Sequence, residues 1–351
     1  MSAWNSGVAL VAALLAASCS SGSGPIGGVG GGSSTGGGEA TGGGSGAGGS
    51  GGGVALVAPP PQWAPQGTRV TWNGVSFIVP PGMTGTDQTS RYDLIDMGSG
   101  GINTCGITIN APVAASGDLA QQANDILVQG YMAQGYQVLD DNYGTNLIGN
   151  RTQGRSPKGW DWVELRAELR KTGPSPERGH ILLVGLGSQV VPILGYSPEN
   201  DGCTQLAHDN TAGIIGELRW RQLAYSLDFS GLTASAVSVV GQWSLFQANS
   251  GQEYVFAANG RYQHWGGLTT AHQISSTEIE LVTSSFTGDG AWKVEGDVLA
   301  LFPDGRAPEA YLFRVFEHHS ISATGVVRKD VKLGLMKQDV AGPYELAVIK
   351  H

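Results

Sequence analysis

The sequence has little charge and lacks the motifs that most enzymes carry. Charged residues make up 14% of the 351 residues, and the net charge of −9 includes no basic stripe in either half of the chain. These features argue against a nucleic-acid partner. Residues 62–351 contain no G-x-S-x-G, H-E-x-x-H, P-loop or dinucleotide-binding glycine motif. We therefore expect a protein that is not an enzyme and needs no cofactor or metal, and an unrecognised enzyme is the least favoured alternative.

Long apolar runs are missing as well. Residues 8–17 form an apolar run of ten residues, about half of the ~20 that span a bilayer and typical of a signal peptide. The run leads into "AASC", which ends at Cys19 with Leu15 just before it. This resembles the lipobox of bacterial lipoproteins, although residues 1–7 lack the usual Lys or Arg. The resemblance implies that Cys19 becomes the lipidated N-terminus, and an ordinary secretory signal with an incidental cysteine is the alternative.

Glycine is concentrated directly behind this cysteine. Of the 56 glycines, 19 lie within residues 20–53, a segment with too few side chains to offset its ordering entropy. The N-terminal part is thus expected to be a signal peptide (1–18) followed by a lipidated cysteine and a disordered tether (19–61). This organisation predicts a lipid-anchored protein of the cell envelope, at the outer membrane or cell surface rather than the inner membrane.

Residues 62–225 have the pattern of an antiparallel sheet with flanking helices. Asn73-Gly74 between two β-rich runs predicts a tight hairpin. Apolar spacing over residues 119–131 predicts a helix with Asp118 in its first turn, and a second helix is expected to close the segment. With "GVSFIVPPGM" near the start and "GYSP" before the last helix, this order resembles the PsbP-like family. The resemblance implies an α+β domain and a role as an accessory or assembly factor.

One strand of this segment carries alternating charges. Glu164, Arg166, Glu168 and Arg170 fall on one face of the strand, with apolar residues on the other. We expect a solvated ladder of salt bridges. An acid/base pair made by Glu164 and Glu168 is the alternative.

Cysteine is scarce. With Cys19 lipidated, only two cysteines remain, Cys105 and Cys203. Two cysteines within one domain of an exported protein are expected to form a disulfide. Two buried free thiols are the alternative.

Residues 240–351, which follow a polar linker at 226–239, contain eight or nine short β-rich runs separated by turn sequences. Such a meander predicts an up-and-down barrel, because closure removes exposed strand edges. Gly241-x-Trp243 on the first strand resembles the signature of the lipocalin-like (calycin) barrels. The resemblance implies that Trp243 is buried at the closed end, with a basic side chain across its ring. The basic residues that we consider for this contact are Arg314, Arg328 and Lys350.

Alternating aromatic residues in this segment suggest a ligand site. The residues expected to line it are Tyr254, Tyr262, His264 and Phe313. Rings that simply fill the barrel are the alternative. His318 and His319 beside Glu317 imitate a metal site, but adjacent strand residues point to opposite faces, so we expect a polar strand end.

These observations favour a non-enzymatic, membrane-anchored envelope lipoprotein that binds a small hydrophobic ligand or an envelope protein through its barrel. The alternative is a scaffold or assembly factor with a solidly packed barrel and a protein partner. A barrel cavity would distinguish the two hypotheses.

Overall fold

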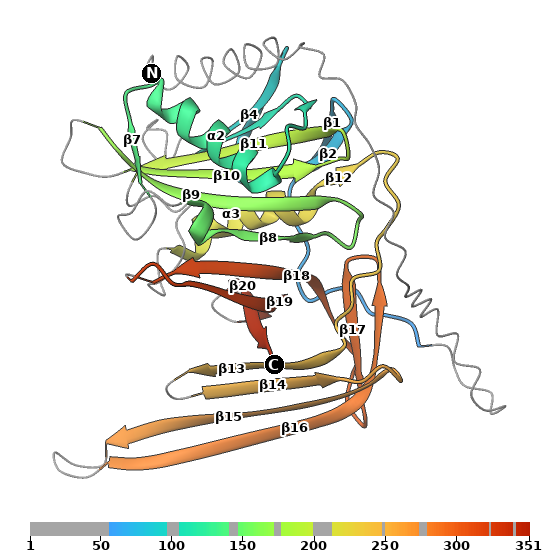
Figure 1. Ribbon diagram of the computed structural model, residues 1–351. Helices are drawn as coiled ribbons and strands as arrows, with labels where there is room; N and C mark the ends of the chain where they lie inside the picture. Colours follow the sequence, from blue (N-terminus) through green and yellow to red (C-terminus); the bar gives the residue numbers. More distant parts are fainter. Residues whose placement is uncertain are drawn as a thin grey trace, which may run out of the picture.

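The computed structural model describes residues 56–96, 105–139, 147–171, 177–198, 213–247, 250–273, 279–322, 324–339 and 342–351. Strands dominate these residues (Figure 1), which contain only two α-helices, each of 14 residues. The predicted α+β class with flanking helices is therefore wrong, and the fold is mostly β with a large antiparallel sheet. The prediction failed because several strands are 13 or 17 residues long, and because strands as well as helices cover the sheet.

The first part of the chain forms a sheet with one helix on one face and a second helix near the other. Its elements are β1 (Thr68–Trp72), β2 (Val75–Val79), β3 (Thr84–Gln88), β4 (Arg91–Asp96), β5 (Cys105–Asn110), β6 (Val113–Ala114), α2 (Leu119–Met132), β7 (Gln137–Leu139), the 3-10 helix η1 (Leu147–Asn150), β8 (Thr152–Arg155), β9 (Asp161–Arg170), β10 (Glu177–Gly185), β11 (Gln189–Pro198), α3 (Gly213–Ser226) and β12 (Asp228–Phe229). The main sheet has the antiparallel order β3-β4-β5-β11-β10-β9-β8.

Two local predictions in this part are confirmed. Asn73 and Gly74 both have positive φ, 48° and 80°, and join β1 to β2 in a two-residue turn, as a type I′ hairpin requires. The predicted helix is α2, and Asp118 is its N-cap rather than a residue of its first turn: the Asp118 side chain accepts a hydrogen bond of 2.9 Å from the backbone N–H of Gln121.

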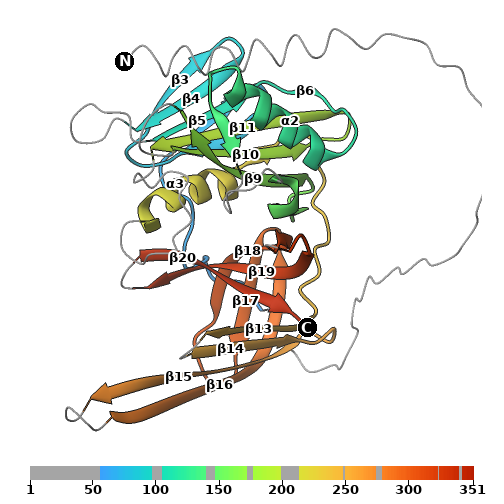
Figure 2. The same ribbon diagram turned by 60° about the vertical axis from the view of Figure 1, so that its left-hand side comes forward.

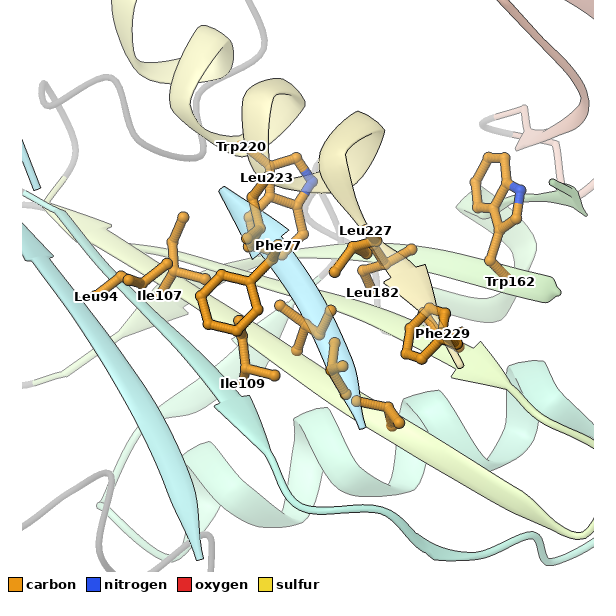
Figure 3. Packing of buried hydrophobic residues seen from close by; sticks show 14 of the residues in the cluster. Phe77, Leu94, Ile107, Ile109, Trp162, Leu182, Trp220, Leu223, Leu227 and Phe229 are labelled. Carbon is orange, nitrogen blue, oxygen red and sulfur yellow. The ribbon is translucent and has the colours of Figure 1, made fainter. Parts of the chain in front are cut away.

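Both faces of the main sheet are buried. Helix α2 packs on one face against Val163, Leu165, Ala167 and Leu169 of β9. The other face meets α3 and the small sheet β1-β2-β12, and Figure 3 shows Phe77 and Trp220 among the buried side chains there. Glu164 on the charged face of β9 therefore lies under α3 rather than in solvent, whereas Arg170 on the same face is exposed.

The second part of the chain forms a ring of consecutive antiparallel strands. These are β13 (Gly241–Gln247), β14 (Ser250–Phe256), β15 (Arg261–Gln273), β16 (Ile279–Glu295), β17 (Val298–Pro303), β18 (Glu309–Ile321), β19 (Val327–Asp339) and β20 (Gly342–Lys350). Each strand pairs with the next. β20 then pairs back with β13 through Trp243 and Ser244, so the strands make a barrel-like ring. We call it the strand ring.

The two parts share hydrogen bonds. Gly154 of β8 pairs with Phe316 of β18, in the part of β18 that follows its pairing with β17. Figures 1 and 2 both show α3 between the main sheet and strands β18 to β20. The domain boundaries at 62–225, 226–239 and 240–351 stay predictions. The main sheet and the strand ring are joined by the pairing of β8 with β18. No helix among the described residues has the length and apolarity to cross a membrane.

Candidate binding site in the strand ring

Seven of the eight strands of the ring contribute buried side chains to one core cluster, and Trp292 and Val294 of β16 pack against it. We call this cluster the ring interior. Its fully or nearly buried members are Val239, Trp243, Tyr254, Phe256, Tyr262, Leu299, Leu301, Tyr311, Phe313, Leu333, Leu335, Leu346 and Val348. The alternation of inward and outward residues along each strand brings these rings together from positions far apart in the sequence.

Trp243 belongs to the ring interior and is completely buried. Its indole N–H donates a 2.7 Å hydrogen bond to the carbonyl of Val239, and the ammonium of Lys350 lies 5.4 Å from the centre of its ring. The predicted contact between Trp243 and a basic side chain is confirmed. Gly241 has a φ of 139°, and a Cβ there would lie 2.9 Å from the Lys350 side chain. Glycine thus leaves room for the lysine beside the indole.

The other two basic residues that we considered have different partners. The guanidinium of Arg314 lies 5.1 Å from the ring of Trp162, outside the ring interior. Arg328 is exposed and pairs with Asp330 at 3.0 Å.

The four residues predicted to bind ligand are gathered in or beside the ring interior. Tyr254, Tyr262 and Phe313 belong to the cluster. His264 faces Tyr254 across the β14–β15 pair, and the two rings stack with centroids 4.0 Å apart. Their role in binding stays a prediction.

Lys337 brings a positive charge to this group of rings. Its ammonium donates a 3.0 Å hydrogen bond to the hydroxyl of Tyr254 and lies 5.3 Å from the centre of the Tyr311 ring. Burial lowers the pKa of Lys337, an effect that the carboxylate of Glu309 opposes. Lys337 was not among the residues predicted from the sequence. Alternation along the strand could have identified it, because Leu333, Leu335 and Lys337 are two residues apart and therefore lie on one face of the strand.

The electrostatic environment keeps His264 neutral. Burial, followed by the charges of Lys337 and Arg306, lowers the pKa of His264 to about 4. The imidazole is therefore uncharged at neutral pH, and the positive charges that act on it are those of Lys337 and Arg306.

A second charged cluster lies between the main sheet and the strand ring. Glu164 is only 4% exposed, so the predicted solvated ladder is wrong at this position. Arg221 of α3 lies 3.5 Å from Glu164 and 3.3 Å from Glu345 of β20. Arg314 makes two hydrogen bonds of 2.6 and 2.8 Å with the carboxylate of Glu345. We call Glu164, Arg221, Arg314 and Glu345 the junction cluster.

Opposite charges keep both carboxylates of the junction cluster ionised. Burial alone would raise the pKa of Glu164, but Arg221 and the other nearby basic groups lower it well below its usual range. Burial also opposes ionisation of Glu345, whose pKa Arg221 and Arg314 lower to about 2. The cluster therefore joins the two parts electrostatically. Its compensated charges give no indication of an acid/base pair.

Two cavities bordered by described residues lie outside the ring interior. One, of about 40 Å³, borders the junction cluster beside Trp160 and Trp162, which is space for water rather than for a ligand. The other is an open groove of about 590 Å³ between α2, β8, β9 and β18.

The remaining predicted sites concern metals and cysteines. His318 approaches Thr152, whereas His319 pairs with Glu317 at 3.2 Å, so the adjacent histidines have different partners. No group of three or more potential metal ligands occurs among the described residues. Cys105 is buried at the start of β5. Cys19 and Cys203 lie outside the described residues, so lipidation and the Cys105–Cys203 pairing stay predictions.

The fold defines a mostly-β protein with a barrel-like ring of strands. Comparisons with known proteins add little to this description. No protein-family model and no curated protein matches the sequence. A protein from Bacteroides thetaiotaomicron with a 1.50 Å crystal structure aligns with 52% of this chain at 11% identity and a TM-score of 0.27, and the chain covers 55% of that protein. The binding domain of botulinum neurotoxin DC aligns with 76% of the chain at 9% identity and a TM-score of 0.09, with 87% of that domain covered.

Proposed function

We propose that the protein is a membrane-anchored envelope lipoprotein that binds a small, largely apolar ligand in a lipocalin-like barrel. The observation that carries the proposal is the ring interior itself, where aromatic rings from many strands meet the partly buried cation Lys337 and the neutral His264. Protein binding sites for small molecules combine an apolar lining with a few polar groups, and this composition of the lining, rather than a cavity, is what supports the proposal. Binding, rather than catalysis, is the activity that this arrangement supports best.

The aromatic lining supports an aromatic or aliphatic ligand body. Tyr254 and Phe256 lie on the same side of β14, and the ring of Tyr262 is 6.2 Å from that of Phe256. Trp292 contacts Phe256 edge to face at 5.7 Å. Rings of this kind provide a large contact area with little loss of side-chain entropy.

The membrane anchor rests on the N-terminal sequence. A lipid on Cys19 and the glycine-rich tether behind it would hold the strand ring near a bilayer, where apolar molecules are concentrated. A Gly/Ser coil of this length, residues 20–53, reaches roughly 30 Å root-mean-square.

A dye titration tests the binding function. The full chain carrying Cys19→Ala avoids competition from its own lipid, and N-phenyl-1-naphthylamine is a neutral dye whose emission rises and shifts to the blue in apolar surroundings. We expect saturable one-to-one binding, weakened about tenfold or more by Tyr262→Ala, because that variant removes a buried aromatic contact.

Trp265→Ala is the matched control. Trp265 is on the same strand as Tyr262 but is 39% exposed, so its loss should leave the affinity unchanged. Absence of saturable binding would contradict the proposed function and favour a packed scaffold. Equal effects of the two variants would place the dye outside the ring interior.

A further inference from the structure

Strands β15 and β16 form a hairpin that extends beyond the strands on either side of it. β14 pairs with β15 only as far as Leu268, whereas β15 and β16 stay paired to Gln273 and Ile279. On the other side, β17 pairs with β16 only over residues 290–295. Figures 1 and 2 both show the two strands reaching past β13 and β14, with β16 outermost. Among the described strands, β16 therefore has no partner along its outer edge before residue 290.

Hydrogen bonds at the end of β16 show which of its residues face this outer edge. Trp292 donates its backbone N–H to the carbonyl of Gly260 at 2.8 Å, on the side of β15. The carbonyl of Asp289 accepts a hydrogen bond of 2.8 Å from the N–H of Asp304, on the side of β17. The register between β15 and β16 is unbroken, and successive residues of an antiparallel strand direct their N–H and C=O groups to opposite sides. The odd-numbered residues of β16 therefore face the outer edge.

Part of this edge is covered and part is open. The carbonyl of Thr287 accepts a hydrogen bond of 2.7 Å from the guanidinium of Arg306, which closes the edge at that position. The odd-numbered residues from 279 to 285 lie before it and pair outward with no described strand. Their N–H and C=O groups form a row that can bind another extended strand.

The sequence of this open segment favours such pairing. Residues 281–287, "LVTSSFT", contain no charged residue, proline or glycine. Proteins commonly protect an exposed edge with lysine, proline, a bulge or a short strand, whereas an uncharged segment rich in β-branched residues is a template for a further strand. The part of the hairpin beyond β14 also has only two strands, and two strands alone are marginally stable in water. A further strand would stabilise it.

We propose that the outer edge of β16 pairs with the same edge of a second copy of this chain, antiparallel about a twofold axis at Thr283. The edge is complementary to itself in this arrangement, because Leu281 of one copy is opposite Ser285 of the other and Glu280 is opposite Phe286, so that no like charges meet. The product is a continuous sheet in the order β15-β16-β16-β15, closed by twofold symmetry. This dimer is independent of ligand binding in the strand ring.

Sedimentation velocity over a series of protein concentrations tests the dimer. The chain carrying Cys19→Ala excludes association through a lipid, and we expect it to show a monomer–dimer equilibrium. Thr283→Pro removes the outward N–H at the twofold axis from both copies. It should raise the dissociation constant about tenfold or more, because two hydrogen-bond donors are lost at the centre of the interface. Thr283→Val is the matched control, which keeps the N–H and the preference for a strand and should leave the dissociation constant unchanged.

Far-UV circular dichroism checks the fold of each variant. Where Thr283→Pro changes the fold, Ser285→Pro supplies the same comparison, because the N–H of Ser285 also faces the outer edge. A chain that sediments as a monomer at every concentration would overturn the inference, as would a dimer that neither proline weakens. Assemblies larger than a dimer that bind thioflavin T would overturn it as well, since they would show open-ended pairing of edges instead of a closed twofold interface.

Discussion

Replacement of Trp243 by alanine should strongly destabilise the strand ring. The indole is completely buried, and Trp243 pairs with both Tyr254 of β14 and Lys350 of β20, where the last strand returns to the first. The substitution therefore removes a large core side chain at the position where the ring closes.

The expected magnitude follows from three contributions. Loss of a buried tryptophan costs ~3–5 kcal/mol in total, including the cavity that it leaves. Within this sum, the hydrogen bond to the carbonyl of Val239 contributes ~1 kcal/mol. The cation–π contact contributes ~0.5–1 kcal/mol, since Lys350 is exposed to solvent. The rest comes from lost packing and apolar burial.

Urea unfolding followed by far-UV circular dichroism measures the effect. Trp265→Ala is the matched control, because Trp265 is 39% exposed and its removal should change the free energy of unfolding by less than ~0.5 kcal/mol. Trp243→Phe should give an intermediate loss. A loss below ~1 kcal/mol for Trp243→Ala, or one equal to that of the control, would refute the argument that this indole anchors the ring.

Three further predictions concern the anchor, the cysteines and the junction cluster. Mass spectrometry of the native protein should find an acylated N-terminal peptide that begins at Cys19, and Cys19→Ala should release the protein from membranes; an unmodified terminus elsewhere would contradict the lipobox. Peptide mapping without reductant should find Cys105 linked to Cys203, whereas two thiols that react with an alkylating agent in the folded protein would contradict the bond. Arg221 and Arg314 hold the pKa of Glu345 at about 2, below its ordinary value of 4.5, so its stabilising contribution is present above pH 4.5 and is lost as the pH falls towards 2. Glu345→Gln should therefore lower stability at pH 7, by up to about 3 kcal/mol, and make it vary less between pH 5 and 2 in urea titrations; an unchanged pH profile would contradict this account.

Short-range signals in the sequence were sufficient for several elements. Asn73-Gly74 predicted the β1–β2 turn because few dipeptides adopt two positive φ angles. Asp118 marked the start of α2, and the resemblance of Gly241-x-Trp243 to the lipocalin signature implied a buried indole beside a basic side chain. Each of these depends on residues close in the chain or on one dominant side chain.

The sequence by itself thus determined the succession of strands, the first helix and the aromatic character of the ring interior. Only the tertiary structure decided the mostly-β class, the burial of Glu164 and the position of Lys337 beside Tyr254. Alternation along a strand assigns residues to two faces, but it does not say what covers each face. Glu164 of β9 is covered by α3 and the strand ring. Arg221 of α3 and Arg314 of the strand ring lie close to its carboxylate, so a position that resembles part of a solvated ladder belongs to a buried charge cluster.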